Sequence, residues 1–265
     1  MKRKLLTLLE IVLGIVLVVS LGMIARTELQ YTKGAETYEE AFDMARPPKL
    51  TVTPAPLVRA EAQEEEEADP DPNLVLLAAM HIEELGKINP DALGWIAIPD
   101  TVISYPLLQT DDNEYYLHHT WRGENSIVGA VFMDCRSSAD MTDFNTIIYG
   151  HNMRDGSMFG TMSDYLEQEH WRAHPSVYLV CGGTAYRSDI FAACEADVEG
   201  PVYQHLDKDE HEREAFIAEC LALSEIDTGI VPTADDHILT LSTCTGRGYS
   251  NRWAVQAVLA ETYTG

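Results

Sequence analysis

Cys244 stands at the end of an apolar stretch, where a thiol would be accessible to a substrate. Residues 238–243 favour a buried strand, because apolar and β-branched side chains dominate them. Gly246 and Gly248 follow the cysteine and predict a flexible turn. Cysteines in the middle of strands are usually inert small hydrophobic residues. A thiol at a strand end beside such a turn is instead placed to act as a nucleophile.

His151 is the candidate base or acid for this thiol. A cysteine nucleophile needs a base or an imidazolium close by, and nearby positive charge favours its thiolate form. The apolar run 145–149 predicts a strand, and Gly150 then leads directly into His151. We therefore expect the histidine and the cysteine at the ends of strands, where the two side chains can meet.

Two arginines follow Cys244 and could supply the positive charge. Arg252 directly precedes residues 253–259, an alternating segment that predicts a strand, so its side chain could sit over the thiol. Arg247 lies within the glycine-containing turn. Either side chain could instead be a solvated turn residue, and spacing from the cysteine does not decide between them.

Two motifs surround these residues: TLSTC at 240–244, with an arginine downstream, and YGHNM-x-DGSMFG at 149–160. Segments at 89–99 and 112–117 accompany them. Together the motifs resemble those of class B sortases, cysteine transpeptidases of Gram-positive bacteria, in family order from about Leu74 to the C-terminus. TLSTC alone would be a weak signal, but the ordered set is specific.

The resemblance implies a sortase-type eight-stranded β-barrel with peripheral helices. The many short predicted strands support a mostly β domain independently, though not the closure of a barrel. The catalytic residues that the resemblance implies are His151, Cys244 and Arg252, since the family's arginine directly precedes the last strand. The supporting residues expected around them are Asn152, Ser242 and Thr243.

The reaction that the resemblance implies is transpeptidation. The Cys244 thiolate would attack a threonine carbonyl in the C-terminal sorting signal of a secreted protein, at a Thr-Gly-like bond. An amine of a cell-wall precursor, of peptidoglycan or of a pilin would then resolve the thioester. His151 would give and take the proton, while Arg252 would hold the substrate carbonyl. We expect no cofactor and no metal in this scheme.

Two other classes of function remain open. One is a cysteine peptidase that only hydrolyses its substrate, although papain-like enzymes carry the cysteine before the histidine, whereas here His151 precedes Cys244. The other is a catalytically silent surface module that binds a partner with the same fold. The intact set of histidine, cysteine and arginine argues against the second class, and a test for thioester capture separates both from a transpeptidase.

The composition argues against nucleic acid as a partner. The formal net charge is −25, whereas binding a phosphate backbone needs clustered lysine and arginine. The five cysteines form no CxxC pair, and no cysteine–histidine cluster has the spacing of a zinc site. Apart from Cys244, the cysteines fall in apolar or helical patterns and are interpreted as core residues: Cys135, Cys181, Cys194 and Cys220.

The N-terminal segment predicts a membrane anchor. Residues 5–25 are almost wholly apolar and follow the basic residues Lys2, Arg3 and Lys4. A helix of this length spans a bilayer, and the basic flank predicts a cytoplasmic N-terminus with the rest of the chain outside the cell. A cleaved signal peptide is the competing interpretation, but no clean small-residue cleavage site ends the apolar run.

The chain is therefore expected to divide into a cytoplasmic tip and anchor (1–25), an extracellular acidic and proline-rich linker (26–72) and a catalytic domain (73–265). Six prolines and four glutamates at 64–67 predict a stiff, self-repelling linker. Such a linker would act as a spacer that lifts the catalytic domain off the membrane.

Helical spacing predicts one amphipathic helix over 74–88, capped by Asn73, and another over 211–223. Class B sortases carry a helix at the position of residues 211–223, beside the substrate groove. Gly129 marks a bulge or a close approach inside a predicted strand. Besides those around the candidate site, strands are expected at 95–98, 102–108, 127–133, 177–180 and 185–193.

Overall fold

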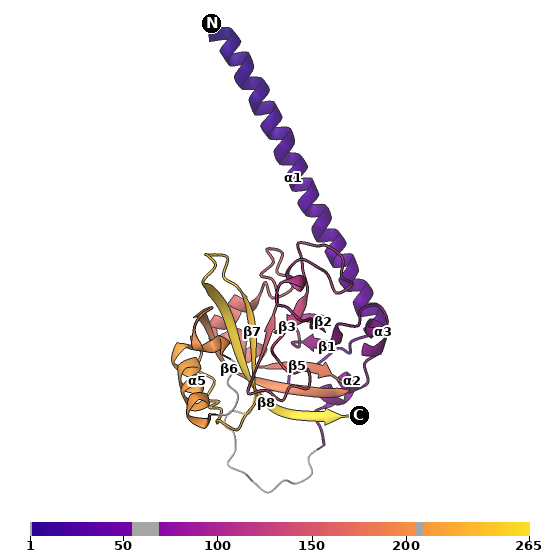
Figure 1. Cartoon of the computed structure of the whole chain (residues 1–265), viewed down its shortest axis with the longest axis vertical. Helices are drawn as coiled ribbons and strands as arrows, with labels where there is room; N and C mark the ends of the chain where they lie inside the picture. Colours follow the sequence, from indigo (N-terminus) through magenta and orange to yellow (C-terminus); the bar gives the residue numbers. More distant parts are fainter. Residues whose placement is uncertain (1, 55–68, 205–208) are drawn as a thin grey trace.

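The computed structural model describes residues 2–54, 69–204 and 209–265. Across these ranges, eight strands close into a barrel in the order β1-β2-β3-β4-β7-β8-β6-β5 (Figure 1). The strands are β1 (Ala92–Ala97), β2 (Ser104–Leu108), β3 (Val131–Met133), β4 (Asn145–Tyr149), β5 (Ser176–Cys181), β6 (Thr184–Asp197), β7 (Ile238–Cys244) and β8 (Asn251–Thr264). The pairs β2–β3 and β4–β7 are parallel in an otherwise antiparallel barrel. The predicted barrel is confirmed.

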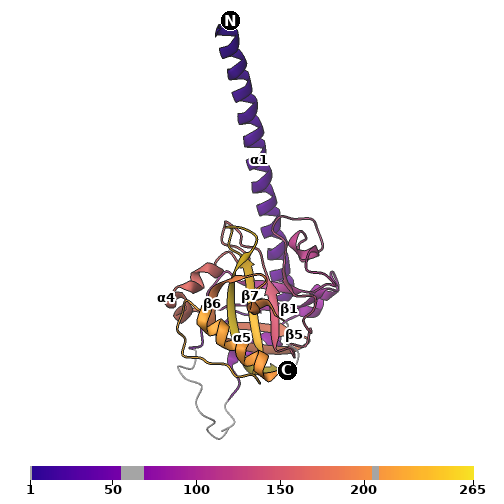
Figure 2. The same cartoon turned by 60° about the vertical axis from the view of Figure 1, so that its left-hand side comes forward.

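Helices lie around the barrel and at the N-terminus. They are α1 (Lys2–Ala45), α2 (Pro72–Ala78), α3 (Ile82–Gly86), α4 (Gln168–Ala173) and α5 (Glu210–Leu223), with short 3-10 turns η1 (Tyr115–Leu117), η2 (Met162–Leu166) and η3 (Pro201–Tyr203). The helix α5 was expected almost residue for residue, and it packs on β6, in front of the barrel in Figure 2. We did not predict α4 and η3.

Apolar side chains of the strands fill one contiguous core, in which Trp95 of β1, Phe132 of β3 and Leu179 of β5 are almost fully buried. A second cluster lies beneath α5 and includes Phe216 and Cys220. Burying a side chain of phenylalanine size contributes about 2–3 kcal/mol. This second cluster therefore fixes α5 to the outside of the barrel.

The N-terminal helix α1 is long and apolar over its first half. Figure 1 shows it projecting from the barrel as a single rod with the N-terminus at its far end. An 18-residue window in its Leu9–Ala45 portion has a mean hydropathy of 2.2 and none of that window is buried. The helix is therefore long and apolar enough for a membrane anchor, and a signal sequence has the same properties.

The second half of α1 packs against the barrel, which differs from the linker expected over 26–72. Tyr38, Ala41 and Ala45 are buried. Beyond the helix, Leu50 is also buried, because residues 46–54 run along the domain. The acidic run at 64–67 lies outside the described residues. The three-part division of the chain stays a prediction, but residues 34–54 are attached to the domain rather than held away from it.

The single helix expected over 74–88 is wrong, because it is two helices, α2 and α3. They pack on different surfaces: α2 lies against β5, β6 and β8, whereas α3 lies against β1 and α1. A continuous helix could not follow both surfaces, so tertiary packing overrides the periodicity. Asp71 is the cap of α2, since its carboxylate accepts from the Asn73 backbone N–H. The Asn73 side chain instead binds the backbone of Thr51.

Candidate active site

Parallel pairing of β4 and β7 brings the predicted histidine and cysteine to one edge of the barrel. Tyr149 lies opposite Ser242 in this pair, and the Gly150 N–H donates to the Ser242 carbonyl at 3.1 Å. The carboxyl ends of two adjacent parallel strands point the same way, so the residues that follow them meet. His151 follows β4, and Cys244 is the last residue of β7.

Asn152 joins the two strand ends directly. Its side-chain Nδ2 donates to the carbonyl oxygen of Cys244 at 2.7 Å. Asn152 also forms an isolated antiparallel bridge with Met158, so the loop after His151 folds back on itself. Asn152, one of the expected supporting residues, thus connects the loop after His151 to the end of β7.

Of the two arginines that follow Cys244, Arg252 lines the pocket and Arg247 does not. Arg252 pairs directly with Cys244 in the β7–β8 register and lines the same pocket. Its Nη1 donates to the carbonyls of Tyr249 and Asn251, at 2.9 and 3.0 Å. The Arg247 guanidinium is held elsewhere, because it lies 4.8 Å from the Trp253 ring centre and donates to a carboxylate of β6.

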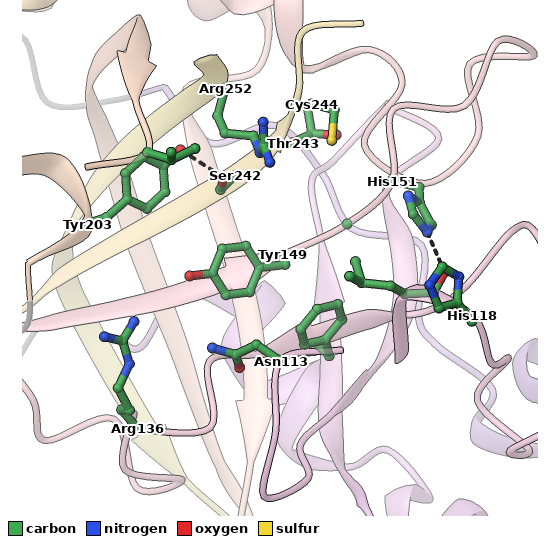
Figure 3. Close-up of a pocket in the computed structure, with 14 residues that line it drawn as sticks. Asn113, His118, Arg136, Tyr149, His151, Tyr203, Ser242, Thr243, Cys244 and Arg252 are labelled. Carbon is green, nitrogen blue, oxygen red and sulfur yellow. Dashed lines mark hydrogen bonds between the residues drawn. The ribbon is translucent and has the colours of Figure 1, made fainter. Parts of the chain in front are cut away.

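One pocket of about 460 Å³ contains the three predicted catalytic side chains. In the view of Figure 3, Cys244 lies between the Arg252 guanidinium and the His151 ring. The lining residues are Asn113, Leu117, His118, Phe132, Arg136, Tyr149, Gly150, His151, Val198, Tyr203, Ser242, Thr243, Cys244 and Arg252. The pocket has room for several side chains of an extended peptide.

The His151 ring is held by the backbone on two sides. Its Nε2 lies 2.7 Å from the carbonyl oxygen of Leu117. A carbonyl can only accept, so Nε2 carries a hydrogen and Nδ1 is the nitrogen left for proton transfer. The ring also packs on Gly129, where a Cβ would lie 2.6 Å from Cδ2, and Gly129 has a φ of +61°. The close approach expected at Gly129 is confirmed.

Cys244 differs from the other cysteines in exposure. It is exposed, whereas Cys181, Cys194 and Cys220 are buried. Burial raises the pKa of Cys181 to about 11 and that of Cys194 to about 12, so these thiols stay protonated at neutral pH. Cys135 is partly exposed, so its assignment to the core was only partly right.

Ser242 and Thr243 precede the cysteine on β7 and are both buried. The Ser242 hydroxyl lies 2.9 Å from the Tyr203 hydroxyl, which ties the strand end to η3. Burial raises the pKa of Tyr203 to about 12, so it stays neutral. In the described chain the Thr243 hydroxyl has no hydrogen-bond partner. Ser242 and Thr243 therefore shape the end of β7.

The side of the pocket away from Cys244 carries a fixed charge pair. Arg136 makes two hydrogen bonds, of 2.9 and 2.7 Å, to the carboxylate of Asp134, which is fully buried. The Tyr149 hydroxyl donates to the same carboxylate at 2.9 Å. Burial and then the charge of Asp134 raise the pKa of Tyr149. The Arg136 side chain is 58% exposed and lines the pocket.

Several pocket residues were not singled out from the sequence. Asn113 and Leu117 lie inside a segment, 112–117, that was matched to the family, so that match was a signal for them. Tyr203 comes from the unpredicted turn η3, and no local pattern marks it. Over residues 2–54, 69–204 and 209–265, no group of three or more His, Cys, Asp or Glu side chains is placed to hold a metal ion.

Comparison with known proteins places this site in a family. The sortase domain family matches residues 96–260. Sortase B of Listeria monocytogenes is 38% identical over 163 residues, which cover 62% of this chain and 66% of the relative. The match to Staphylococcus aureus sortase B likewise spans 66% of that relative, at 32% identity. The chain thus spans about two thirds of the length of the curated relatives it matches.

Solved structures agree with this match. Sortase B from B. anthracis superposes with a TM-score of 0.70 at 28% identity, covering 88% of this chain and 99% of the other. The S. aureus sortase B–substrate complex gives a TM-score of 0.64 at 30% identity, covering 68% and 84% of the two chains. Sequence, fold and pocket thus lead to one conclusion: the chain belongs to the sortase B family of cysteine transpeptidases.

Proposed function

We propose that this protein is a membrane-anchored cysteine transpeptidase with Cys244 as nucleophile, His151 as acid and base, and Arg252 as the substrate-carbonyl donor. The observation that carries the proposal is the shared pocket, in which the ends of β4, β7 and β8 bring these three side chains together. Acyl transfer needs a nucleophile, an acid–base group and a donor to the substrate carbonyl. The exposed thiol, Nδ1 of His151 and the Arg252 N–H groups that bind no described residue would supply them.

The reaction begins when the Cys244 thiol gives its proton to Nδ1 of His151, and the resulting thiolate attacks a peptide carbonyl carbon. Arg252 donates a hydrogen bond to the carbonyl oxygen, which becomes negatively charged as the tetrahedral intermediate forms. The C–N bond then breaks, and His151 gives the proton on Nδ1 to the departing amine. The product is a thioester between the enzyme and the new C-terminus of the substrate.

An amine completes the transfer. It attacks the thioester carbonyl, His151 takes its proton on Nδ1, and the Cys244 thiolate leaves. The Leu117 carbonyl keeps Nε2 protonated throughout, so the same nitrogen serves as acid in the first step and as base in the second. Water in place of the amine would give hydrolysis instead.

The substrates proposed are secreted proteins with a C-terminal sorting signal, cut at a Thr-Gly-like bond. The acceptor proposed is an amine of a cell-wall precursor, of peptidoglycan or of a pilin. A related S. aureus sortase B has been solved with a substrate, and another sortase B with a glycine tripeptide. These two complexes support a sorting-signal peptide and a glycine amine as the first reagents to test.

The location proposed is the outer face of the cell membrane. The apolar half of α1 would cross the bilayer once, with its basic N-terminus in the cytoplasm and the barrel outside. An extracellular barrel would meet both secreted proteins and cell-wall amines. The acidic net charge of −25 offers no attraction for nucleic acid.

The test is intact-mass spectrometry of the full chain in detergent micelles. The protein is incubated with a pool of sorting-signal peptides, with and without a glycine tripeptide. We expect an acyl adduct on Cys244 and, with the amine, a ligated peptide. The Cys244→Ala variant should lose the adduct completely, while Cys135→Ala, at the other incompletely buried cysteine, should keep it.

The other classes of function are outcomes of the same experiment. Cleavage without ligation to any amine would identify a cysteine peptidase. A Cys244 that forms no adduct and does not react with a thiol reagent would favour a binding module. An adduct that persists in Cys244→Ala would overturn the proposed nucleophile.

A further inference from the structure

The second half of α1 touches the backbone that supports His151. Tyr38 of this helix is buried, and its hydroxyl donates to the Gly129 carbonyl at 2.5 Å. The two residues are 91 positions apart in the chain. A buried carbonyl that loses such a donor costs about 1–3 kcal/mol in other proteins, so this bond holds Gly129 firmly in place.

Gly129 is also the residue on which the His151 ring rests. A Cβ at this position would lie 2.6 Å from Cδ2 and 2.9 Å from Nε2 of His151. Nε2 is the atom that donates to the Leu117 carbonyl. The hydroxyl of Tyr38 and the ring of His151 therefore contact the same glycine, and a shift of Gly129 changes where the ring can sit.

A second route leads from Tyr38 to the other side of His151. Tyr38 packs edge-to-face on Tyr105, with ring centres 5.5 Å apart. The Tyr105 hydroxyl accepts from the backbone N–H of Met158 at 2.9 Å. Met158 pairs with Asn152, and the Phe159 N–H donates to the His151 carbonyl at 3.0 Å. Tyr38 thus supports the loop that carries the histidine as well as the surface behind its ring.

Other contacts fix this part of α1 to the barrel, so Tyr38 has a defined position. The Trp121 indole donates to the Thr37 carbonyl at 2.7 Å, and Arg122 pairs with Glu40 at 2.6 Å. Tyr38 itself does not line the pocket that contains Cys244. Its effect on catalysis must therefore pass through the histidine rather than through contact with a substrate.

We propose that Tyr38 is a positioning residue for His151, so that the barrel-bound half of α1 sets the geometry of proton transfer. The proposal rests on the proposed function in one respect, the role of His151 in the transfer. It assigns a catalytic contribution to the same helix that carries the predicted anchor. The membrane-proximal helix is then part of the active enzyme and not only a tether.

The test compares Tyr38→Phe with the wild-type full chain in the peptide ligation assay. A displacement of about 1 Å at a catalytic group can reduce a rate by up to about 100-fold. We expect kcat to fall by roughly tenfold, with KM for the peptide unchanged, because only the positioning of the histidine is altered. Gly129→Ala should lower kcat further, because the new methyl group would overlap the ring.

Tyr165→Phe is the matched control. Tyr165 is buried as Tyr38 is, and its hydroxyl also donates to a backbone carbonyl, that of His174 at 3.0 Å. It has no contact with Gly129 or with the His151 ring. Both variants lose one hydrogen bond from a buried tyrosine to a backbone carbonyl, so the control accounts for a general loss of stability. Only Tyr38→Phe should lower kcat.

A second measurement does not depend on turnover. In protein with ¹⁵N-labelled histidine, NMR observes the Nε2–H of His151, which His151→Gln identifies. Tyr38→Phe should accelerate exchange of this hydrogen with water, and Tyr165→Phe should not. Wild-type exchange together with wild-type kcat in Tyr38→Phe would overturn the proposal, and so would equal losses of kcat in both variants. An inactive wild type would instead refute the proposed function. The exchange measurement would still decide whether Tyr38 positions His151.

Discussion

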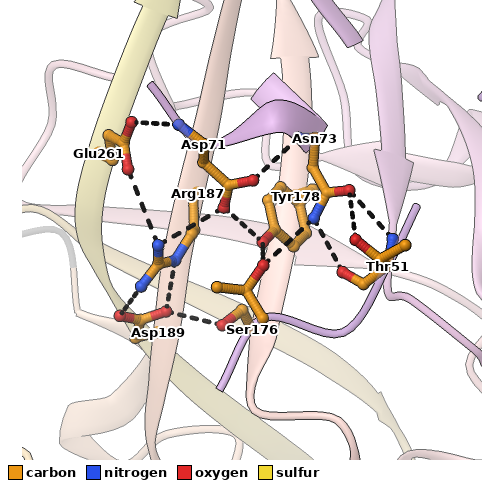
Figure 4. A network of polar contacts seen from close by, with 9 residues as sticks. Thr51, Asp71, Asn73, Ser176, Tyr178, Arg187, Asp189 and Glu261 are labelled. Carbon is orange, nitrogen blue, oxygen red and sulfur yellow. Dashed lines mark hydrogen bonds and ion pairs between the residues drawn. The ribbon is translucent and has the colours of Figure 1, made fainter. Parts of the chain in front are cut away.

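Two polar regions of this protein use their hydrogen-bonding groups in opposite ways. The first is the network around Arg187, on the side of the barrel where α2 packs (Figure 4). The second is the pocket that contains Cys244 (Figure 3). In the first, each charged group is matched by protein partners. In the second, the groups proposed for chemistry keep donors and acceptors unshared.

The Arg187 network is buried and fully connected. Arg187 donates to both oxygens of Asp189, each at 3.0 Å, and also approaches Asp71 at 3.5 Å. Asp71 additionally accepts from Tyr178 at 2.8 Å, and Asp189 from Ser176 at 2.7 Å. Both carboxylates are at most 4% exposed. The network joins α2 to β5 and β6, and it leaves little capacity for a ligand.

The Cys244 pocket is arranged differently. The thiol is exposed. Arg252 uses only Nη1 to bind the carbonyls of Tyr249 and Asn251, so its Nε and Nη2 have no partner within the described residues. His151 binds the Leu117 carbonyl through Nε2, and Nδ1 has no hydrogen bond to the described residues. In this protein a cluster whose polar groups are all hydrogen-bonded to one another has a structural role. The polar groups at the barrel edge lack some hydrogen-bond partners, and a substrate can supply them.

The largest expected effect comes from removing the arginine of the buried Arg187 network. Arg187→Ala leaves Asp71 and Asp189 buried without their cation, which should lower the free energy of unfolding by about 3–5 kcal/mol. Urea denaturation measures this loss. Activity per folded molecule should not change, because the network lies outside the pocket.

An exposed arginine provides the control for Arg187. Arg172 pairs with Glu169 on the surface of α4, where an ion pair contributes about 0.5 kcal/mol or less. Arg172→Ala should therefore leave the unfolding midpoint almost unchanged. Equal destabilisation by the two substitutions would show that burial of the Arg187 network does not matter.

In the Cys244 pocket, removing an arginine should lower the reaction rate and leave the stability almost unchanged. Arg252→Ala should lower the rate of thioester formation by about 10²–10³, equivalent to about 2.7–4 kcal/mol, because a donor to the developing oxyanion is lost. The free energy of unfolding should change by only about 0.5 kcal/mol, since the side chain binds one exposed carbonyl and one part-buried carbonyl at the edge of the barrel. Quenched-flow mass spectrometry measures the rate. A rate loss accompanied by an equal loss of stability would erase the contrast between the two regions.

Local sequence patterns predicted much of the site but not the contacts that hold it in place. Apolar and β-branched residues predicted the strand at 145–149 and the strand that ends at Cys244. The barrel was predicted from the order of the family motifs. The two-helix form of residues 72–86 follows from packing on separate strands, which no local periodicity encodes. The contact of Tyr38 with Gly129 spans 91 positions, so the local sequence around Tyr38 gave no sign of its partner.

The smallest expected effect tests whether every unpartnered group in the pocket serves chemistry. Thr243 is buried at 3% exposure, and its hydroxyl has no partner in the described part of the chain. A buried hydroxyl without a partner costs stability, so Thr243→Val should be neutral or stabilising by up to about 1 kcal/mol, with a rate change below about twofold. Ser242→Ala is the comparison, since it breaks the bond to Tyr203 and should cost about 1 kcal/mol. Paired urea denaturation and ligation assays give both quantities.

If Thr243→Val reduced ligation by tenfold or more without loss of stability, the hydroxyl would contact the substrate. Incomplete partnering would then mark chemistry even at buried positions of this strand end.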